Sequence, residues 1–429
     1  MDYLYLYVGV ILIAMVLYVR RQRRIHHSHA ADLEASVEEG TVEPSSLHPV
    51  INPIRCIGSG TCVKACPEGA LGIVKGKAVL TNASACIGHG ACRTACPVEA
   101  ITLVFGTEKR GVDIPEVSPE FESNVPGIFI AGELGGMGLI RKATEQGRQA
   151  IETIRKRKRG NADYDVVIVG CGPAGLSAGL AALQHKLRYK LIEQEDSLGG
   201  AVYHYPRQKI AMTAPVELAI IGKVKFGEVQ KEKLLEFWLD VVRKTSLKIS
   251  FRERMEGVTP AAGGFVVRTD RGQYRSGSVL LALGRRGTPR KLGVPGEETA
   301  KVAYRLVDPA QYRGQAVLVV GGGDSALEAA IALSQEQGTD VTLSYRSEAF
   351  SRVKQKNRLS LEQQQQVGRL RVLLQSSVKQ IHTKDVEIEH DGRVQRLRND
   401  AVIVCAGGLL PTPLLQQAGI RFDTKFGTA

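Results

Sequence analysis

The sequence has few aromatic side chains for so basic a protein. Aromatic residues make up 5% of the 429 residues, while the formal net charge is +13. A basic surface that binds single-stranded nucleic acid stacks bases on aromatic side chains, and no basic stretch here is interleaved with them. The charge therefore indicates an anionic membrane or an acidic partner, and argues against nucleic acid.

Only one long apolar run is present, and it lies at the N-terminus. Tyr3–Val19 reads YLYLYVGVILIAMVLYV and is followed by arginines at 20, 21, 23 and 24. A signal peptide would carry its positive charge before the apolar run. The run therefore predicts a short transmembrane helix, and the positive-inside rule places the rest of the chain in the cytoplasm. A buried core helix is the alternative. Residues 25–49 are polar and non-periodic and predict a tether.

Six of the eight cysteines fall within residues 56–96. They belong to two segments, RCIGSGTCVKACPEGALGIV and ACIGHGACRTACPVEAITLV, which repeat at an offset of 30 residues. Each segment reads C-x5-C-x3-C-P. Evenly spread cysteines in a short secreted chain would suggest disulfides. Tight groups that end in proline indicate metal ligation in a reducing compartment.

Both segments resemble the run C-x2-C-x2-C-x3-C-P of two-cluster bacterial ferredoxins, but the second cysteine is absent. Ser59 stands there in the first repeat and His89 in the second. The clusters could be [3Fe–4S], or [4Fe–4S] with Ser59, His89 or solvent on the fourth iron. Zinc and a cluster-free relic are the alternatives, and zinc fits Cys3Ser poorly. The resemblance implies one cluster on Cys56, Cys62 and Cys96, and another on Cys66, Cys86 and Cys92.

A first dinucleotide-binding turn lies at Tyr164–Gly175, YDVVIVGCGPAG. An apolar strand precedes the pattern G-x-G-x-x-G and a helical pattern follows it, which lets the backbone approach a pyrophosphate at a helix N-terminus. A second apolar strand ends at Glu193, where a carboxylate would bind a ribose. Cys171 is expected to be a small filler of the turn. The candidate binding residues are Gly170, Gly172, Pro173, Ala174, Gly175, Glu193 and Gly200.

A second fingerprint lies at Ala316–Ala326, AVLVVGGGDSA, and reads G-x-G-x-x-A. The strand that follows ends in basic residues, where an acid would favour NADH. Arginines at this place suit the 2′-phosphate of NADPH, and a solvated basic loop is the alternative. The candidate binding residues are Gly321, Gly323, Asp324, Ser325, Arg346 and Arg352.

Two nucleotide folds in one chain, joined near Val279–Glu297, resemble the two-dinucleotide-binding flavoproteins. This family includes thioredoxin reductases and bacillithiol-reductase-like members, and the resemblance covers most of residues 107–429. It implies FAD at the first turn and NAD(P)H, preferably NADPH, at the second. It also implies that Gly284 ends one of the strand-to-glycine crossings between the two domains.

The order of segments departs from that family. Its members close the FAD domain with a C-terminal strand that ends in Gly-Asp and is followed by a helix. Here Pro126–Ile151 carries that pattern, with Gly132 and Glu133 in place of Gly-Asp. The resemblance therefore implies a circular permutation. The C-terminal RFDTKFGTA should then lie beside FGTEKRGVD at Phe105, because permutation joins chain ends that are close in space.

The chain contains no C-x-x-C motif, and residues 285–404 contain no cysteine. The nucleotide-domain dithiol of thioredoxin reductases is therefore excluded. Electrons from the flavin need another exit, and the clusters provide one to an unidentified acceptor or donor, protein or small molecule. No side chain is required as an acid or base, so no catalytic residue is predicted.

A disulfide reductase that uses Cys171 and a membrane-tethered redox sensor are the alternative functions. The sequence is compatible with a homodimer.

The predicted fold class is α/β, with two Rossmann-like domains, an α+β ferredoxin-like domain and one transmembrane helix. The predicted segments are an anchor (1–24), a tether (25–49), the iron–sulfur domain (50–105), the permuted piece (107–155), the FAD domain (163–284), the NAD(P)H domain (285–405) and a return to the FAD domain (406–429).

Overall fold

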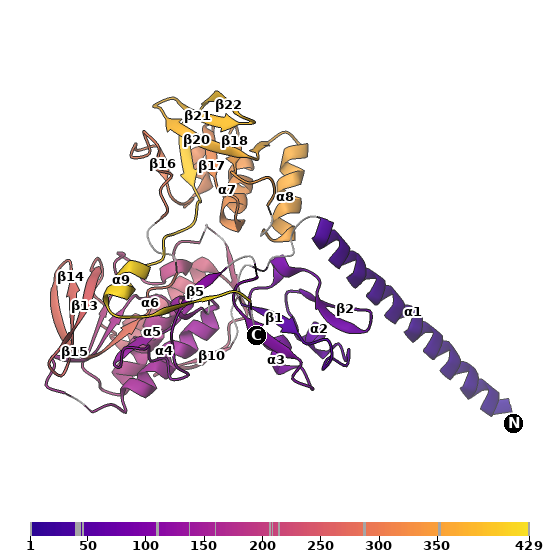
Figure 1. The fold of residues 1–429 in the computed structure, drawn as a ribbon, viewed down its shortest axis with the longest axis horizontal. Helices are drawn as coiled ribbons and strands as arrows, with labels where there is room; N and C mark the ends of the chain where they lie inside the picture. The colour runs from indigo at the N-terminus through magenta and orange to yellow at the C-terminus, as the bar shows by residue number, and fades with distance from the viewer. Residues whose placement is uncertain are drawn as a thin grey trace. The chain divides into compact units, whose positions relative to one another are not determined.

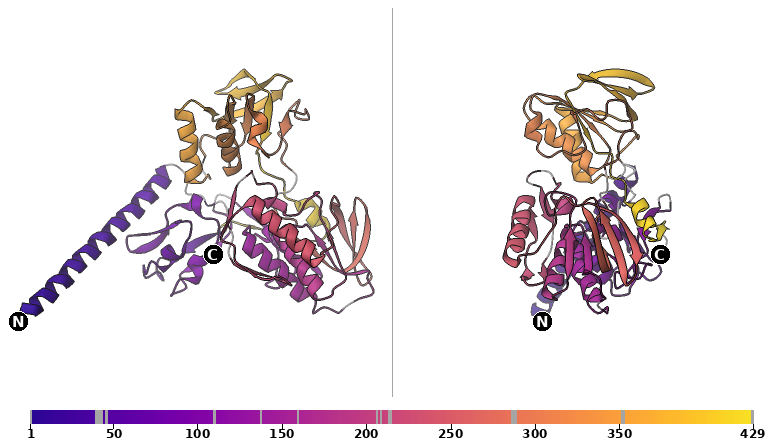
Figure 2. Two further views of the ribbon diagram at one scale, coloured as in Figure 1. Left: turned by 180° about the vertical axis from the view of Figure 1, so that it is seen from behind. Right: turned by 90° about the vertical axis from the view of Figure 1, so that its left-hand side faces the viewer.

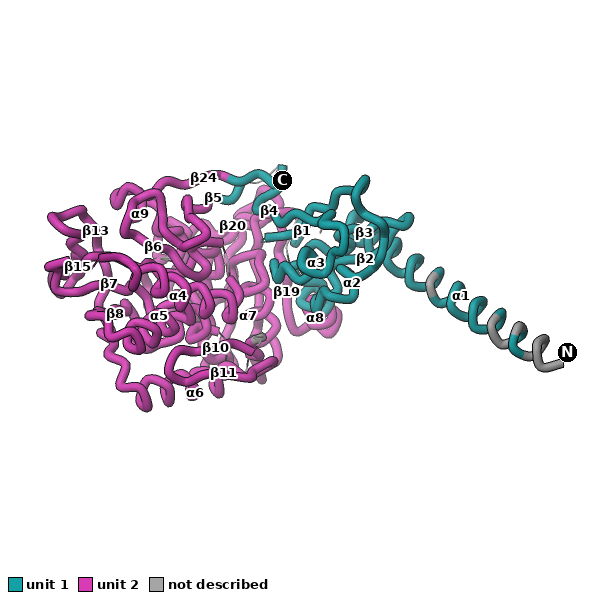
Figure 3. Tube along the Cα trace, turned by 90° about the horizontal axis from the view of Figure 1, so that it is seen from below, with its two compact units in different colours: residues 1–112, 349–359, 425–429 teal, residues 113–348, 360–424 magenta. Residues whose placement is uncertain are grey.

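The computed structural model describes residues 2–38, 44, 47–108, 111–136, 138–158, 160–205, 207, 209–212, 215–285, 289–350 and 353–427. The chain divides into two compact units, which Figure 3 colours separately. The first unit consists of residues 1–112, 349–359 and 425–429, and the second of residues 113–348 and 360–424. The predicted ligand Arg352 lies outside the described residues.

The first unit begins with a long helix, α1 (Asp2–Glu38), which Figure 2 shows as one continuous helix. Residues 25–38, which the sequence predicts as part of a tether without helical periodicity, therefore continue this helix. Two side chains of α1 bind the domain that follows. His29 Nδ1 accepts a hydrogen bond from the Ile73 N–H at 3.0 Å, and Ser36 Oγ donates to the Thr81 carbonyl at 2.8 Å. Packing of this kind stabilises a helix whose sequence alone gives a weak signal.

A membrane-spanning helix is not found. In the described part of the chain, no helix is both long and apolar enough to cross a bilayer. The anchor and the cytoplasmic orientation stay predictions from the sequence, without support from the structure.

The cysteine repeats form a small domain of short elements. β1 pairs with β4 in antiparallel register, with His48 opposite Val104, and β2 pairs with β3. The two short helices start after glycines in the left-handed region, Gly60 (φ 71°) and Gly90 (φ 75°), where glycine has no steric penalty. The elements are β1 (His48–Ile51), α2 (Thr61–Ala65), β2 (Leu71–Val74), β3 (Lys77–Leu80), α3 (Ala91–Thr94) and β4 (Ile101–Val104).

The first nucleotide domain is built on a six-stranded sheet in the order β13-β14-β15-β7-β8, with β6 also paired to β15. Figure 1 shows this sheet with α4 and α5 nearby. The strands are β6 (Ile128–Ile130), β7 (Tyr164–Val169), β8 (Tyr189–Ile192), β13 (Met255–Ala261), β14 (Gly264–Thr269) and β15 (Gly272–Leu281). The other elements are α4 (Ile140–Ile154), α5 (Pro173–Gln184), β9 (Ile210–Met212), β10 (Val216–Leu218), β11 (Gly222–Val224), β12 (Glu228–Gln230) and α6 (Lys231–Thr245).

Both faces of this sheet are apolar, as expected for buried parallel strands. Alternate residues of β7 point to opposite faces. Val166 and Ile168 belong to a core that includes residues of α4, α5 and α6. Val167 and Val169 belong to a second core, which includes residues of β13, β14 and the C-terminal helix α9 (Thr412–Gln417).

The permuted piece is an integral part of this domain. β6 lies parallel to β15, with Ile128 opposite Val279. The C-terminal strand β24 (Phe422–Lys425) pairs with β5 (Val112–Pro115). Thr424 Oγ1 donates to Asp113 Oδ1 at 2.7 Å, and the Gly427 N–H donates to the Phe105 carbonyl at 2.8 Å. The predicted meeting of the C-terminus with the segment at Phe105 is confirmed.

The second nucleotide domain contains a parallel sheet in the order β16-β23-β17-β18-β19 and a separate antiparallel sheet, β20-β21-β22. The first four residues of β17 are buried. The second glycine turn connects β17 to α7. The elements are β16 (Val302–Ala303), β17 (Ala316–Val320), α7 (Asp324–Ser334), β18 (Asp340–Ser344), α8 (Gln355–Gln366), β19 (Leu370–Leu373), β20 (Ser376–Ile381), β21 (Asp385–His390), β22 (Arg393–Arg398) and β23 (Ala401–Val404).

The contact between α4 and α5 gives a first prediction. A Cβ atom added at Gly147 of α4 would lie 2.0 Å from the carbonyl oxygen of Ala174 in α5. We expect Gly147→Ala to lower the free energy of unfolding by about 1–3 kcal/mol, because the two helices must move apart. Urea denaturation measures the change. The control is Gly227→Ala, whose added Cβ meets nothing within 4 Å. Equal stability of the two variants would contradict the prediction.

Candidate cofactor and cluster sites

The first glycine turn connects β7 to α5 and leaves its backbone accessible. Gly170 has φ 100°, and a Cβ there would lie 2.6 Å from the Ala282 carbonyl oxygen. A Cβ at Gly175 would lie 1.8 Å from the Gly170 carbonyl oxygen. Both glycines are therefore required for the turn itself. Pro173 is the first residue of α5, a position that suits its fixed φ.

Gly172 has a different part in the same turn. Its φ is −74°, and a Cβ there would make only an ordinary contact, at 3.8 Å from Gly200 Cα. Gly172 and Gly200 thus face each other across the N-terminus of α5. The missing side chains leave room for a ligand to approach backbone N–H groups, as a pyrophosphate requires.

Glu193 lies at the end of β8 beside this turn and is 6% exposed. Its Oε2 accepts a hydrogen bond from the Cys171 N–H at 2.6 Å, and its Oε1 accepts one from the Glu195 N–H at 3.1 Å. Burial raises the pKa of the Glu193 carboxyl, and these backbone donors oppose the rise. The carboxylate is positioned next to the turn, where the sequence predicted a ribose ligand.

The permuted piece brings Gly132 to the same turn. Gly132 has φ 86°, and its N–H donates to Gln146 Oε1 at 2.8 Å. A Cβ at Gly132 would lie 3.1 Å from the Ala174 Cβ. Glu133 starts the short helix after Gly132 and is half-buried. Gly284 has φ 67° and lies just beyond β15.

The second glycine turn connects β17 to α7. Gly321 has φ 147°, and a Cβ there would lie 2.4 Å from the Cys405 carbonyl oxygen. Gly323 directly precedes α7, and a Cβ there would meet nothing within 4 Å. Asp324 and Ser325 open the helix. Gly323 thus leaves the same open approach to a helix N-terminus as Gly172 does in the first turn.

Arg346 follows β18 at the edge of the second turn. The Gly321 N–H donates to the Ser344 carbonyl at 2.9 Å, which joins the ends of β17 and β18. A Cβ at Gly322 would clash with the ring of Tyr345. Arg346 itself is exposed and, in the part of the chain described, makes no ion pair. Its guanidinium is available for an anion near the turn.

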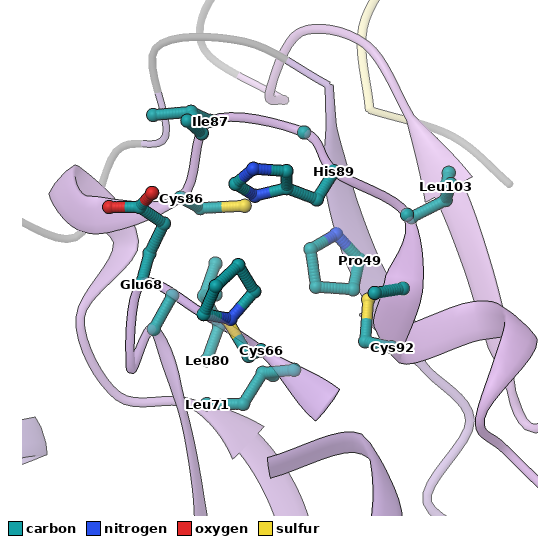
Figure 4. Close-up of a pocket in the computed structure, with 15 residues that line it drawn as sticks. Pro49, Cys66, Glu68, Leu71, Leu80, Cys86, Ile87, His89, Cys92 and Leu103 are labelled. Atoms are coloured by element: carbon teal, nitrogen blue, oxygen red, sulfur yellow. The ribbon is translucent and has the colours of Figure 1, made fainter. Parts of the chain in front are cut away.

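Three cysteines line one pocket of the cysteine domain (Figure 4). They are Cys66, Cys86 and Cys92, which come from both repeats in the crossed arrangement that the ferredoxin resemblance implies. His89 and Glu68 line the same pocket, and the Cys86 sulfur and the His89 ring are both directed into it. Burial raises the pKa of the Cys92 thiol to about 11. The backbone N–H of Arg93 opposes this rise, and the charges of Cys86 and Cys66 add to it.

The other three cysteines, Cys56, Cys62 and Cys96, are close enough to interact electrostatically. Burial raises the pKa of the Cys62 thiol, the backbone N–H groups of Val63 and Cys62 oppose the rise, and the charges of Cys56 and Cys96 add to it. The Ala78 N–H donates to Cys56 Sγ at 3.5 Å, and the Ala100 N–H donates to Cys96 Sγ at 3.3 Å. Backbone donors to sulfur are among the features that tune iron–sulfur clusters.

The donor chemistry fits iron–sulfur clusters at both groups. Soft thiolates are the ligands that these clusters require, and each group offers three. Within the described residues, no three histidine, cysteine, aspartate or glutamate side chains converge on a point that would hold a single metal ion. That finding concerns single ions, whereas the cysteine groups would hold polynuclear clusters.

Sequence reasoning missed three residues that shape these sites. Gly147 permits the close approach of α4 to α5, and Gln146 holds the Gly132 N–H. Both lie in an apparently ordinary helix, so no sequence signal identified them. Glu68 shares the pocket with His89. A comparison of the two repeats could have identified Glu68, because the second repeat has the apolar Val98 at the same position.

Comparison with known proteins identifies the larger part of the chain. The pattern of the pyridine nucleotide-disulphide oxidoreductase family matches residues 167–427. The chain belongs to this family. The match contains both glycine turns of the oxidoreductase and ends just after the C-terminal strand β24. The permuted piece lies before it in the chain.

The cysteine domain of the oxidoreductase matches a second family. Residues 48–97 match the 4Fe-4S dicluster domain, which supports the iron–sulfur prediction over the zinc alternative. This match contains all six clustered cysteines, Ser59 and His89.

Individual relatives agree with the family assignment. A ferredoxin–NADP reductase of Levilactobacillus brevis is 34% identical over 44% of this chain and 55% of its own length. One of Ignicoccus hospitalis is 32% identical over 52% of this chain and 67% of its own length. The chain thus spans about half the length of the first relative. A bacillithiol disulfide reductase of Bacillus cereus has a similar structure, with a TM-score of 0.54 and 26% identity, over 60% of this chain and 82% of that one.

The two glycine turns give a second prediction, in which each variant is the control for the other. We expect Gly172→Ala to fold normally but to lose bound flavin, because its Cβ makes no clash yet blocks the approach to the helix N-terminus. Gly323→Ala should keep its flavin and bind NADPH at least about tenfold more weakly. Flavin absorbance after gel filtration and NADPH titration measure the two effects. Loss of flavin from both variants, or from neither, would contradict this division of roles.

Proposed function

We propose that the chain is an NADPH-dependent flavoprotein that exchanges electrons with its own iron–sulfur domain. The observation that carries this proposal is the presence, in one chain, of two open glycine turns and two groups of three cysteines. When bound, FAD and the clusters supply the chemistry that joins a hydride donor to one-electron carriers.

The residues of the chain bind and position these groups. Gly172 and Gly323 leave the N-termini of α5 and α7 open to pyrophosphates, and Glu193 lies beside the first turn for a ribose. The helix N-termini attract the phosphates through their unpaired N–H groups. Gly132 brings the permuted piece to the first turn, so that this piece contributes to the flavin site.

The names of the relatives support the same activity. Both relatives are called ferredoxin–NADP reductase, a name that pairs ferredoxin with NADP. The present chain carries a dicluster domain in addition to the reductase domains. We infer that this domain takes the place of a first ferredoxin partner, and that a protein or small molecule outside the chain exchanges electrons with it.

Anaerobic reduction by NADPH tests the proposal. We expect NADPH to bleach the flavin absorbance of the purified chain and to produce an EPR signal from reduced clusters. The control is Gly323→Ala, which should give the signal with dithionite but not with the same concentration of NADPH. Bleaching of the flavin with no cluster signal, or a preparation without flavin, would contradict the proposal. Steady NADPH turnover with an artificial acceptor would argue against a sensor that does not catalyse.

The position of Arg346 predicts the coenzyme preference. We expect Arg346→Ala to raise the KM for NADPH about tenfold and to leave the KM for NADH unchanged, because only NADPH carries the 2′-phosphate. Steady-state kinetics with both coenzymes measure the ratio. Arg393→Ala, an exposed arginine of β22, is the control and should change neither value. Equal effects of Arg346→Ala on both coenzymes would contradict a 2′-phosphate contact.

A disulfide reductase is the second candidate, because the structure resembles a bacillithiol disulfide reductase. Cys171 lies in the first turn but is 0% exposed, and burial strongly raises the pKa of its thiol. A thiol of this kind is a poor nucleophile. The hydrogen bond from Cys171 to Glu193 uses the backbone N–H and does not involve the thiol. Cys171→Ala should therefore retain cluster reduction by NADPH, and loss of a disulfide reductase activity in this variant would support the second candidate instead.

A further inference from the structure

The two cysteine repeats differ most at the position where each lacks a cysteine. The first repeat has Ser59 and the second has His89. A hydroxyl is a poor ligand for a soft iron–sulfur centre, whereas an imidazole nitrogen replaces cysteine in some clusters. The surroundings of Ser59 and His89 decide whether either side chain is placed to bind a cluster.

His89 belongs to the pocket of Cys66, Cys86 and Cys92. It is half-buried, and Figure 4 shows its ring directed into the space that the three cysteines enclose. Gly88 and Gly90, on either side of it, have positive φ values of 80° and 75°. The loop therefore turns tightly on both sides of His89 and presents its side chain to the pocket.

Glu68 lines the same pocket and has an oxygen without a partner. Its Oε1 is buried and makes no hydrogen bond to any described residue. The Glu68 carboxylate is close enough to act electrostatically on His89. A histidine that binds a metal through one ring nitrogen usually donates its other N–H to a carboxylate or carbonyl. The unpaired Glu68 oxygen is available for this second contact.

The corresponding place in the first repeat has neither feature. Ser59 is exposed, and its hydroxyl lies 3.1 Å from Thr61 Oγ1, with which it hydrogen-bonds. The residue that corresponds to Glu68 is Val98, which packs against the apolar core of the domain. A candidate nitrogen ligand and a carboxylate partner are therefore present only beside the group of Cys66, Cys86 and Cys92.

We propose that a ring nitrogen of His89 is the fourth protein ligand of the cluster held by Cys66, Cys86 and Cys92, and that Glu68 positions the ring. This inference rests on the proposed iron–sulfur function of the domain. A neutral imidazole in place of a thiolate makes the cluster less negative and raises its reduction potential. The two clusters of the domain are then unequal, and the Cys3His cluster is the better electron acceptor of a matched pair of [4Fe–4S] centres.

Pulsed EPR of the full chain tests the ligand directly. The protein is prepared anaerobically with its clusters, labelled with 15N-histidine and reduced with dithionite. We expect a nitrogen hyperfine coupling in the reduced cluster signal that responds to the label and is absent in His89→Cys. Absence of any histidine nitrogen coupling in the unsubstituted chain would overturn the proposal.

Iron content and potential give an independent readout. His89→Cys completes the four-cysteine pattern, so it should keep its iron and shift the potential of one cluster to a more negative value. His89→Ala should lose about one iron atom per chain, because a cubane corner without a ligand is labile. Ser59→Ala is the matched control and should change neither quantity. Identical iron content and spectra in His89→Ala and the unsubstituted chain would also overturn the proposal.

The role of Glu68 is tested by the same nitrogen coupling. Glu68→Ala should retain the cluster but change the coupling, and Glu68→Gln, which keeps an acceptor oxygen, should restore it. An unchanged coupling in Glu68→Ala would remove the positioning role and leave His89 as a ligand. A chain that binds no iron at all would instead refute the proposed function of the domain.

Discussion

The pairing of β6 with β15 is the constraint on which the first nucleotide domain depends. The Ala131 N–H donates to the Leu281 carbonyl at 3.1 Å, so the permuted strand ends level with β15. Phe129 faces one core of the domain, and Ile128 and Ile130 face the other. Without β6, the main-chain groups of β15 would lack a partner on one side and both cores would lose buried side chains. The strand also fixes Gly132 beside α5, which couples the stability of the sheet to the shape of the first glycine turn.

Much of this arrangement could be predicted from the sequence because its signals are local. A buried strand, three glycines and a helix make a dinucleotide turn wherever they occur in the chain, and Gly170 and Gly175 have the close contacts that the motif implies. The permutation could be predicted for the same reason, since the displaced segment keeps its strand-glycine-helix order. The helical continuation of α1 could not, because it depends on contacts of His29 and Ser36 with residues far along the chain.

The cysteine domain shows the same division between local and distant signals. Spacing alone predicted which six cysteines act together, and crossing of the repeats followed from the ferredoxin resemblance. The environment of the missing fourth ligand required the structure. Glu68 and His89 are distant in sequence, and only the fold brings them to one pocket with Cys66 and Cys86. The repeats differ at both of these positions, because Ser59 and Val98 stand where the second site has His89 and Glu68.

The order of segments along the chain has a consequence for the proposed electron transfer that does not depend on how the two units are arranged. After β4, the last strand of the cysteine domain, the chain continues into β5, which pairs with the C-terminal strand β24, and then into β6, which joins the sheet of the first nucleotide domain. The C-terminus returns to this junction, where the Gly427 N–H binds the Phe105 carbonyl. Two segments of the polypeptide, instead of one, therefore connect the cluster domain to the flavin domain. A short connection of this kind gives the cluster domain a high effective concentration at the flavin domain, so the proposed electron exchange between them would be an intramolecular step. The rate of that step would be independent of protein concentration, in contrast to exchange with a separate ferredoxin.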